Sequence, residues 1–427
     1  MTAARKVATD EIGSDIEIAR YLFEEIAART PDTEGVSRPA FSRIETETLR
    51  FLENYARGHG LEVWYDAGQN ANFSLPDDRD ADTYVLVGSH VDSVPQGGNF
   101  DGLAGVVAGL VCLLRARRDG QPFARPVHAL AMRGEESAWF GPCYIGSKAL
   151  MGSLAASEIK ALHKQDGRAL GDHMADVGIP MDTVVKGTPL AEASRISTYL
   201  ELHIEQGPLL IGKNIPAATV SGIRGNVRHR EIRCIGEAGH SGAVPRAYRR
   251  DPVLAMADLL VRLDESWSTI LNKGGDLVIT SGVVSTDPSK HALSRIPDSV
   301  SFSLDIRSQS DKTLDEMREL LTSEMRQVEK DRKVRFEMDE EMRVEPALCD
   351  TTVVEGLMSA MGRVGQEPFV MPSGGGHDAA VFAAAGVPVG MVFVRNRNGS
   401  HNPQEAMELD DFGAAIDILY SYLTDVT

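Results

Sequence analysis

The chain has 427 residues, of which 42% are hydrophobic and 25% charged, a balance typical of a globular enzyme with two or three domains. Its 44 basic and 62 acidic residues give a formal net charge of −18. Because such a charge repels phosphate backbones and anionic lipid headgroups, it argues against nucleic acid or a membrane surface as a partner.

The sequence predicts no targeting or membrane-spanning segment. Residues 1–15 alternate polar and small side chains, without the apolar core of a signal peptide. No later stretch approaches the roughly 20 apolar residues of a membrane span. Four scattered cysteines, without Cys-x-x-Cys spacing, are expected to be free buried thiols: Cys112, Cys143, Cys234 and Cys349. We therefore expect a cytoplasmic protein with neither disulfide bonds nor a cysteine-based metal site.

Elements of an α/β domain occupy both ends of the chain. Apolar runs predict four buried strands, at residues 84–87, 127–132, 196–204 and 389–394. Between the first two, residues 101–118 predict a mostly apolar helix that ends in a basic turn before Gly120. Strands that alternate with helices indicate an α/β layer structure.

The middle of the chain has a different pattern. The predicted order there is strand, helix, two strands, helix and strand, at residues 227–235, 252–263, 277–284, 300–306, 314–329 and 334–338. This order is that of the split β-α-β, ferredoxin-like fold. Residues 299–305 alternate polar and apolar side chains, as in a sheet with one solvated face. We expect a larger domain of residues 1–219 and 339–427, interrupted by a small inserted domain of residues 220–338.

The first chemically informative motifs surround the end of the first predicted strand. GSHVDS, directly after the apolar run, contains His90 and Asp92, and GGNFDG, at the mouth of the next helix, contains Asp101. In open α/β sheets, binding sites form outside the carboxyl ends of the strands. A nearby carboxylate can accept the second ring N–H of a metal-binding imidazole and hold the ring. Taken alone, these residues fit a turn histidine beside a solvated aspartate equally well.

Further motifs follow other strands or lie in glycine-rich segments. RGEE, after the second strand, brings two adjacent carboxylates, Glu135 and Glu136, which repel each other unless a cation lies near them. LHIEQGP places His203 late in the third strand, and the segments GGGHDA and GSHNP carry His377 and His401. Singly, an acidic surface loop or a packed core histidine explains each motif more simply. Together, in one larger domain, they favour a ligand site.

This combination of side chains suits a pair of divalent ions. Two ions bridged by one carboxylate need about four terminal ligands. Around Asp101, these ligands are expected to be His90, His203, Glu136 and His401. Mixed imidazole and carboxylate ligands favour Zn²⁺, with Mn²⁺, Co²⁺ or Ni²⁺ as alternatives. Glu135 then remains free to act as the base that deprotonates a water molecule.

The motifs GSHVDS, GGNFDG, GEES, LHIEQGP, GHSG, GGGHDA and SHNP occur in this order along most of the chain. In this the chain resembles the metal-dependent amidases of the M20 peptidase superfamily, in the N-carbamoyl-L-amino acid hydrolase and allantoate amidohydrolase branch (hydantoinase/carbamoylase family). The resemblance implies a zinc-peptidase-like α/β catalytic domain and an inserted ferredoxin-like (βαββαβ) lid that also forms a homodimer. It implies Glu135 as general base, Asp92 behind His90, and two metal sites: His90, Asp101 and His203, and Asp101, Glu136 and His401.

The same resemblance implies substrate contacts. His240, in AGHSG, would polarise the scissile carbonyl, and Arg307, in DIR, would bind the substrate carboxylate. Gln206 would contact the same substrate, and we expect Ser294 and His377 beside it. The alternative for Arg307 is an ordinary surface arginine at a strand end.

His203 bears on the choice of branch, because peptidase members commonly have an acidic ligand at this position. Carboxypeptidase activity is therefore disfavoured. A dipeptidase or aminoacylase remains an alternative, as does a non-catalytic relative that uses the cleft as a ligand receptor. The free Glu135 argues against the receptor, because a binding protein has no need of a spare carboxylate beside a metal.

The predicted lid departs from the branch pattern. Ser294 and Arg295 stand in SRIP, where the branch usually has Asn-Val-Ile-Pro; Arg246 follows the lid histidine, and Arg395 and Arg397 precede SHNP. These arginines either bind an acidic substrate side chain or pair with the abundant surface carboxylates. The sequence thus predicts a dinuclear amidohydrolase that cleaves the C–N bond of an N-carbamoyl- or N-acyl-L-amino acid, with an acidic side chain as one possibility.

Overall fold

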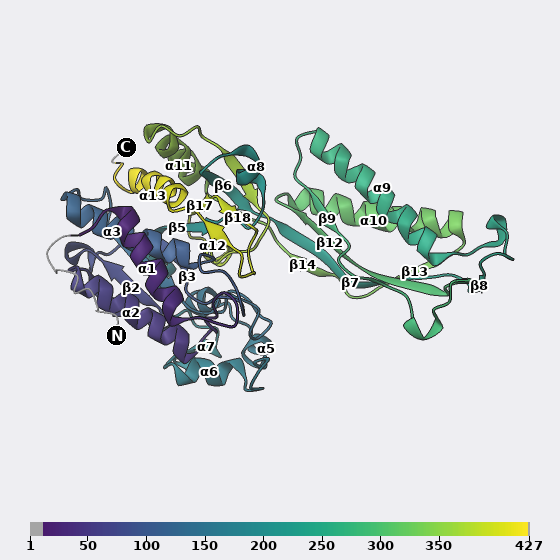
Figure 1. The fold of residues 1–427 in the computed structure, drawn as a ribbon, viewed down its shortest axis with the longest axis horizontal. Coiled ribbons are helices and arrows are strands. Elements are labelled where there is room, and N and C mark those ends of the chain that lie inside the picture. Colours follow the sequence, from purple (N-terminus) through teal and green to yellow (C-terminus); the bar gives the residue numbers. More distant parts are fainter. Residues whose placement is uncertain (1–11, 426–427) are drawn as a thin grey trace. The chain divides into compact units, whose positions relative to one another are not determined.

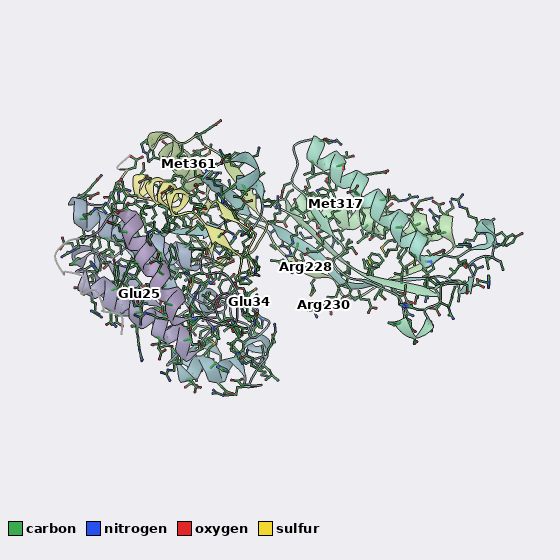
Figure 2. All side chains as sticks on the ribbon, viewed as in Figure 1. Glu25, Glu34, Arg228, Arg230, Met317 and Met361 are labelled. Carbon is green, nitrogen blue, oxygen red and sulfur yellow. The ribbon has the colours of Figure 1, made fainter. Side chains whose placement is uncertain are left out.

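The computed structural model describes residues 12–425, so most of the segment predicted to lack a signal peptide lies outside the described residues. The chain forms two compact units (Figure 1). The first runs to Gly222 and resumes at Leu348, and the second comprises Ile223–Ala347. Each unit has its own hydrophobic core. Met361 belongs to the core of the first unit and Met317 to that of the second, and both are labelled in Figure 2.

The first unit is built on a nine-stranded sheet in the order β1-β2-β4-β3-β5-β17-β6-β15, with β16 paired to β6. Its central strands are mutually parallel, and they match the four predicted apolar runs: β4 (Val127–Met132), β3 (Tyr84–His90), β5 (Ile196–Ile204) and β17 (Val389–Val394). The strands around them are β1 (Glu62–Tyr65), β2 (Ala71–Ser74), β6 (Ala217–Ile223), β15 (Ala347–Leu348) and β16 (Val370–Ser373). Because the central strands are parallel, their carboxyl ends lie along one edge of the sheet.

Helices cover both faces of this sheet. On one face, α3 (Leu103–Asp119), α11 (Thr351–Arg363) and α13 (Leu409–Leu423) contact the strands, and α1 (Asp15–Arg29) packs on α3 and α13; on the other face, α12 (Ala379–Ala384) contacts the strands and packs against α4 (Ile145–Met151). The remaining helices and the short strand pair are α2 (Arg43–Gly58), α5 (Ala156–Ile159), α6 (Leu170–Asp176), α7 (Met181–Val184), α8 (Leu209–Lys213), β18 (Asn396–Arg397) and β19 (Ala406–Met407). The predicted α/β layer structure is confirmed.

The alternation of β5 decides which of its side chains reach the site. Leu200 and Leu202 join the core that includes α3, whereas Tyr199 stacks on Phe382 of α12 with 4.1 Å between the ring centroids. Successive side chains of a strand point to opposite faces, so His203 shares the face of Tyr199. His203 therefore points away from the main apolar core, although it is only 1% exposed.

The second unit contains an antiparallel sheet of six strands with the main path β10-β12-β7-β13; β9 also pairs with β12, and β14 with β7. The strands are β7 (Gly225–Ile235), β9 (Val278–Thr280), β10 (Val284–Ser285), β12 (Ser299–Ser308), β13 (Arg335–Met338) and β14 (Met342–Val344). The helices α9 (Pro252–Asn272) and α10 (Asp311–Arg332) pack on this sheet. The predicted alternation of β12 is confirmed, because Val300, Phe302 and Leu304 are each 1% exposed.

One predicted strand of this unit is interrupted. Residues 277–284 were expected to form a single strand, but β9 ends at Thr280 and β10 begins at Val284. Thr280 lies opposite Asp305, and Val284 lies opposite Phe302. The three residues between Thr280 and Val284 therefore face only the two residues between Phe302 and Asp305 on β12. The extra residue makes a bulge, which breaks the regular pairing.

Two predictions about the chain as a whole can also be compared with the structure. The four cysteines are free thiols; Cys112, Cys234 and Cys349 are buried as expected, whereas Cys143 is only partly buried. No helix within residues 12–425 combines the length and the apolarity that crossing a membrane requires.

Candidate metal centre

The predicted ligands converge because parallel strands end at the same edge. His90 is the last residue of β3, His203 is the second-last residue of β5, and Glu135 lies three residues beyond the end of β4. Asp101 lies just before α3, and His401 lies in the loop between β18 and β19, which follow β17. Residues far apart in the sequence thus meet beyond the carboxyl ends of the central strands.

Asp101 lies between two groups of ligand atoms. Its Oδ1 is 3.5 Å from His90 Nε2 and 3.1 Å from His203 Nε2. Its Oδ2 is 3.6 Å from His401 Nε2, which is in turn 3.3 Å from Glu136 Oε1. The ligand atoms of His90, Asp101 and His203 lie within 4.8 Å of one another, as do those of Asp101, Glu136 and His401. The two groups share one carboxylate and face its different oxygens.

These separations fit metal coordination. Two ligand atoms bound at 2.0–2.2 Å to a tetrahedral metal lie about 3.3–3.6 Å apart. The nitrogen–oxygen distances within the two groups are 3.1–3.6 Å. Deprotonated carboxylates and neutral imidazoles all present lone pairs, so a cation between them satisfies them together. The residues present therefore fit divalent cations.

The histidines and carboxylates of the centre shift one another's pKa values. Burial alone would raise the pKa of Asp101, but the adjacent His203 and His90 hold the pKa well below its usual range. Burial alone would lower the pKa of His90, and hydrogen bonds to Asp101 and Asp92 outweigh it, so the pKa rises well above normal. The hydrogen bond to Glu136 raises the pKa of His401 to about 9. An incoming metal ion must displace these protons, so its binding depends on pH.

Asp92 links the two sequence motifs at the site. Its carboxylate is fully buried, and its Oδ1 lies 3.4 Å from His90 Nδ1. The same carboxylate accepts the backbone N–H groups of Glu135 and Glu136, each at 3.0 Å. The sequence suggested only a position behind His90. The structure shows that Asp92 also orients the segment that carries both glutamates.

Glu135 lies beside the ligand groups but belongs to neither of them. Its Oε2 is 3.9 Å from His90 Nε2. Burial raises the pKa of Glu135 well above its usual value, and the nearby carboxylates of Glu136, Asp378 and Asp92 add to this. A carboxyl group whose pKa is moved towards neutrality is suited to accept a proton and later release it.

Two local features fix the segment that follows β4 and the turn that precedes α3. Arg133 Nη1 forms an ion pair of 2.5 Å with the buried Glu45, whose other oxygen accepts the N–H of Gly134 at 3.1 Å. Gly102 has a φ of +67°, and a Cβ there would lie 2.3 Å from Cε1 of the His90 ring. Only glycine therefore allows the chain to turn into α3 directly against this ligand.

Other contacts with the centre involve side chains that sequence reasoning missed or placed differently. Gln206, expected to contact substrate, donates from Nε2 to Asp101 Oδ2 at 2.9 Å, and Ser400 Oγ donates to the same oxygen. Glu405 Oε1 accepts the N–H groups of Phe100 and Asp101 at 2.8 and 3.2 Å, and burial raises its pKa to about 7. Ser400 adjoins His401 in the sequence, but no local signal marked Glu405.

His377, expected beside the substrate, is 2% exposed. Its ring centroid lies 4.4 Å from that of His203, and its Nε2 is 2.8 Å from Ser373 Oγ. Burial lowers the pKa of His377 well below its usual value, so the ring is neutral. The observed contacts support the ring of His203, and a substrate contact for His377 stays a prediction.

The predicted substrate residues of the second unit fall into separate places. The strands β8 (Gly239–His240) and β11 (Arg295–Ile296) pair so that His240 lies opposite Arg295, and Ser241 N–H donates to the carbonyl of Ser294 at 2.8 Å. Arg307 lies on β12 at the position that pairs with β9, and Figure 1 shows β8 at the other end of this unit. One chain therefore does not bring Arg307 and His240 together.

The additional arginines mostly have acidic partners. Arg395 binds Asp411 through two hydrogen bonds of 2.7 Å and Asn214 at 2.6 Å. Arg397 lies 3.5 Å from a carboxylate oxygen of Glu408, and Arg295 lies 3.6 Å from one of Asp298. Arg246 lines a surface hollow together with Asp251, Asp258 and Asp331. Of the two explanations for these arginines, pairing with surface carboxylates is the better supported.

Comparison with known proteins identifies the family. Residues 86–425 match peptidase family M20/M25/M40. The chain is 32% identical to the N-carbamoyl-L-amino acid amidohydrolase of Geobacillus stearothermophilus, over 90% of this chain and 92% of that relative. It is 29% identical to the allantoate amidohydrolase of Escherichia coli K12, over 90% and 91%. A solved hydantoinase/carbamoylase family amidase from Burkholderia ambifaria matches with a TM-score of 0.83 and 26% identity, over 96% of each chain. The chain belongs to peptidase family M20/M25/M40, a metal-dependent family, and is a hydrolase that acts on C–N bonds.

Proposed function

We propose that this chain is a dinuclear amidohydrolase that cleaves the C–N bond of an N-carbamoyl-L-amino acid, with N-acyl amino acids as related substrates. One observation carries the proposal: the two oxygens of Asp101 face separate ligand groups, and Glu135, which belongs to neither group, has its Oε2 3.9 Å from His90 Nε2. The names of the relatives from Geobacillus stearothermophilus and Escherichia coli support cleavage of a non-peptide amide.

In this proposal His90 and His203 hold one ion with Asp101, while Glu136 and His401 hold the other with the same aspartate. Mixed nitrogen and oxygen ligands favour Zn²⁺, with Mn²⁺, Co²⁺ or Ni²⁺ as alternatives. Divalent ions, when bound, polarise a carbonyl and lower the pKa of water.

Glu135 carries the proton through the reaction. It removes a proton from the attacking water and delivers it to the amino nitrogen that leaves. The C–N bond to the amino acid then breaks, and the released carbamate decomposes to ammonia and carbon dioxide. Asp92 keeps Glu135 in position through its hydrogen bond to the backbone N–H.

We assign the second unit as a ferredoxin-like lid and dimerisation domain. The strand order β13-β7-β12, with β9 and β10 beside β12 and a helix after each of β7 and β12, supports the first part. The places of Arg307 and His240 support the second. Arg307 is proposed to bind the substrate carboxylate, and His240 to polarise the scissile carbonyl. These residues lie at opposite ends of the same unit. They can contact one small substrate only if a second chain contributes one of them.

Subunit complementation tests this dimer. His240→Ala and Arg307→Ala should each be inactive alone. In a C₂ dimer formed from both variants, one site carries both changes and the other carries neither. Random assortment makes half of the dimers mixed, so about a quarter of the parental activity should return. No recovery in dimers shown by mass spectrometry to be mixed would exclude a shared site, and an active monomer in sedimentation would exclude the dimer.

A substrate panel tests the reaction. Ammonia release from N-carbamoyl amino acids and allantoate should be compared with amine release from N-acyl amino acids and dipeptides, with Glu135→Gln as the control. Chelation should abolish turnover, and Zn²⁺, Mn²⁺ or Co²⁺ should restore it. The highest kcat/KM on dipeptides would show a dipeptidase instead. Full turnover in protein shown by elemental analysis to be metal-free would refute the metal mechanism.

A further inference from the structure

A second cluster of potential metal ligands lies in the first unit and has no part in the proposed reaction. The ligand atoms of His163, Asp166 and His173 lie within 4.8 Å of one another. His163 and Asp166 belong to a tight hairpin, in which His163 N–H donates to the carbonyl of Arg168 at 2.8 Å. His173 is on α6, which begins where this hairpin ends. The chain thus folds both imidazoles around one carboxylate.

The distances within the cluster are those of a coordination shell. Asp166 Oδ1 is 3.3 Å from His163 Nδ1, and Asp166 Oδ2 is 3.2 Å from His173 Nε2. Ligand atoms of a tetrahedral zinc ion with bonds of 2.0–2.1 Å lie about 3.3–3.4 Å apart. The two ring centroids are 5.0 Å apart, so both imidazoles approach the carboxylate from neighbouring directions.

Aromatic neighbours hold both rings in place. The His163 ring is stacked on Trp139 at an interplanar angle of 7° and lies 4.9 Å from the ring of Phe140. Phe140 also contacts the His173 ring edge to face, at 5.2 Å. Ligands whose rotamers are fixed by packing lose less entropy when they bind an ion, so the site is preorganised.

The charges of the cluster favour a cation. His163 Nδ1 accepts the backbone N–H of Asp166 at 3.4 Å, so the lone pair of this nitrogen faces the turn that carries Asp166. The carboxylate of Asp166 accepts the backbone N–H of Arg168 at 2.9 Å. The guanidinium of Arg168 itself pairs with Asp176 at 2.7 Å. A neutral imidazole does not compensate the charge of Asp166, whereas a divalent ion would.

The side chains also leave room for a further ligand. His163 and His173 are 9% and 14% exposed in their side chains, but Asp166 is 43% exposed. All three line a surface hollow of about 780 Å³. A fourth position facing this hollow can be filled by water, as in metal sites with three protein ligands.

We propose that His163, Asp166 and His173 form a separate binding site for one zinc-class transition-metal ion. All three ligands belong to residues 163–173, so the ion links the hairpin to α6. Trp139, on which His163 stacks, donates from Nε1 to the carbonyl of Ser93 at 2.8 Å, and the N–H of Lys164 donates to the carbonyl of Trp139 at 2.9 Å. The ion therefore stabilises the hairpin and α6, which pack on Trp139, and has no part in binding the substrate.

The test uses the full chain, stripped of metal and titrated with Zn²⁺ alone. His173→Asn and Asp166→Asn should each lose about one Zn²⁺ per chain, and binding at this site should weaken at least about 10-fold, since loss of even an outer-shell partner costs that much. Asp166→Asn lies in an exposed turn and keeps an acceptor for the N–H of Arg168, so folding is preserved. Saturating Zn²⁺ should raise the melting temperature of the parent more than that of either variant.

His59→Asn is the matched control, because His59 bonds the carbonyl of Tyr55 and has no contact with the cluster. It should keep the parental Zn²⁺ stoichiometry. Repeating the titration in an Asp101→Ala background removes the ligand that both groups of the Asp101 centre share. In that background the remaining Zn²⁺ should disappear with His173→Asn. Equal Zn²⁺ content and affinity in the parent and both cluster variants, or equal losses with His59→Asn, would overturn the proposal whatever the fate of the proposed reaction.

Discussion

Replacing Asp92 with asparagine tests how the metal centre is held together. The fully buried carboxylate accepts two backbone N–H groups, those of Glu135 and Glu136, and lies 3.4 Å from His90 Nδ1. An amide has only one acceptor atom. With the amide oxygen in the place of Oδ1, the NH₂ group faces the N–H of Glu136 and that contact is lost; in the other orientation it faces both the N–H of Glu135 and the His90 ring, and both contacts are lost.

The expected magnitude follows from these contacts. A buried N–H without a partner costs about 1–3 kcal/mol of unfolding free energy. Loss of the outer-shell partner of a metal-binding histidine typically costs 10–100-fold in metal affinity, which is about 1.4–2.7 kcal/mol. Asp92→Asn should therefore weaken metal binding by one to two orders of magnitude and lower turnover at limiting metal, with partial recovery at saturating metal.

Asp78→Asn provides the comparison, because half-buried Asp78 also accepts a backbone N–H, that of Val127 at 3.2 Å, but has no contact with the centre. Metal affinity should be measured by competition with a chelator, and stability by denaturant unfolding of the metal-free chains. Asp78→Asn should leave metal affinity unchanged. If Asp92→Asn binds metal as tightly as the parent, Asp92 does not position His90 and this reasoning fails.

Three further predictions follow from the same geometry. Glu135→Gln should keep its metal and lower kcat by at least about 10²-fold, whereas His203→Ala should lose metal; equal metal loss in both would show that the glutamates are misassigned. Because the hydrogen bond to Glu136 raises the pKa of His401 to about 9, the ring is protonated below that pH and must lose its proton to bind metal. Metal affinity at this group should therefore rise up to about tenfold per pH unit towards pH 9 and then level off; a flat profile would rule His401 out as a ligand. Arg395→Ala should lower the unfolding free energy by about 1.5–3 kcal/mol, because it removes hydrogen bonds to ionised Asp411. It should leave the ratio of kcat/KM for aspartyl and leucyl substrates unchanged, and an altered ratio would place Arg395 at the substrate.

The four central strands were predictable because buried parallel strands are continuous apolar runs. Their ends were less so. The first strand was expected to end at residue 87, yet β3 continues to His90, because Gly88 and Ser89 pair with Leu130 and Ala131 of β4. Pairing with a neighbouring strand, which composition does not report, sets such a boundary.

Single-residue roles were predictable only where a short motif carried them. His90, Asp101 and Glu135 lie in motifs that follow strands, whereas Glu405 supports Asp101 from 304 residues away in the sequence. In the sequence, Glu405 does not stand out from the many other glutamates of this acidic chain. Only folding brings it against the backbone of Asp101.

The sequence by itself determined the chemical types at the centre, imidazoles and carboxylates placed after buried strands, because element order and motif position are local properties. Only the tertiary structure decided that Asp101 turns one oxygen to His90 and His203 and the other towards His401. It also separated Arg307 from His240 and gathered His163, Asp166 and His173 beside Trp139 and Phe140. Distances between side chains depend on strand register and on the packing of distant segments, and neither is encoded within a single motif.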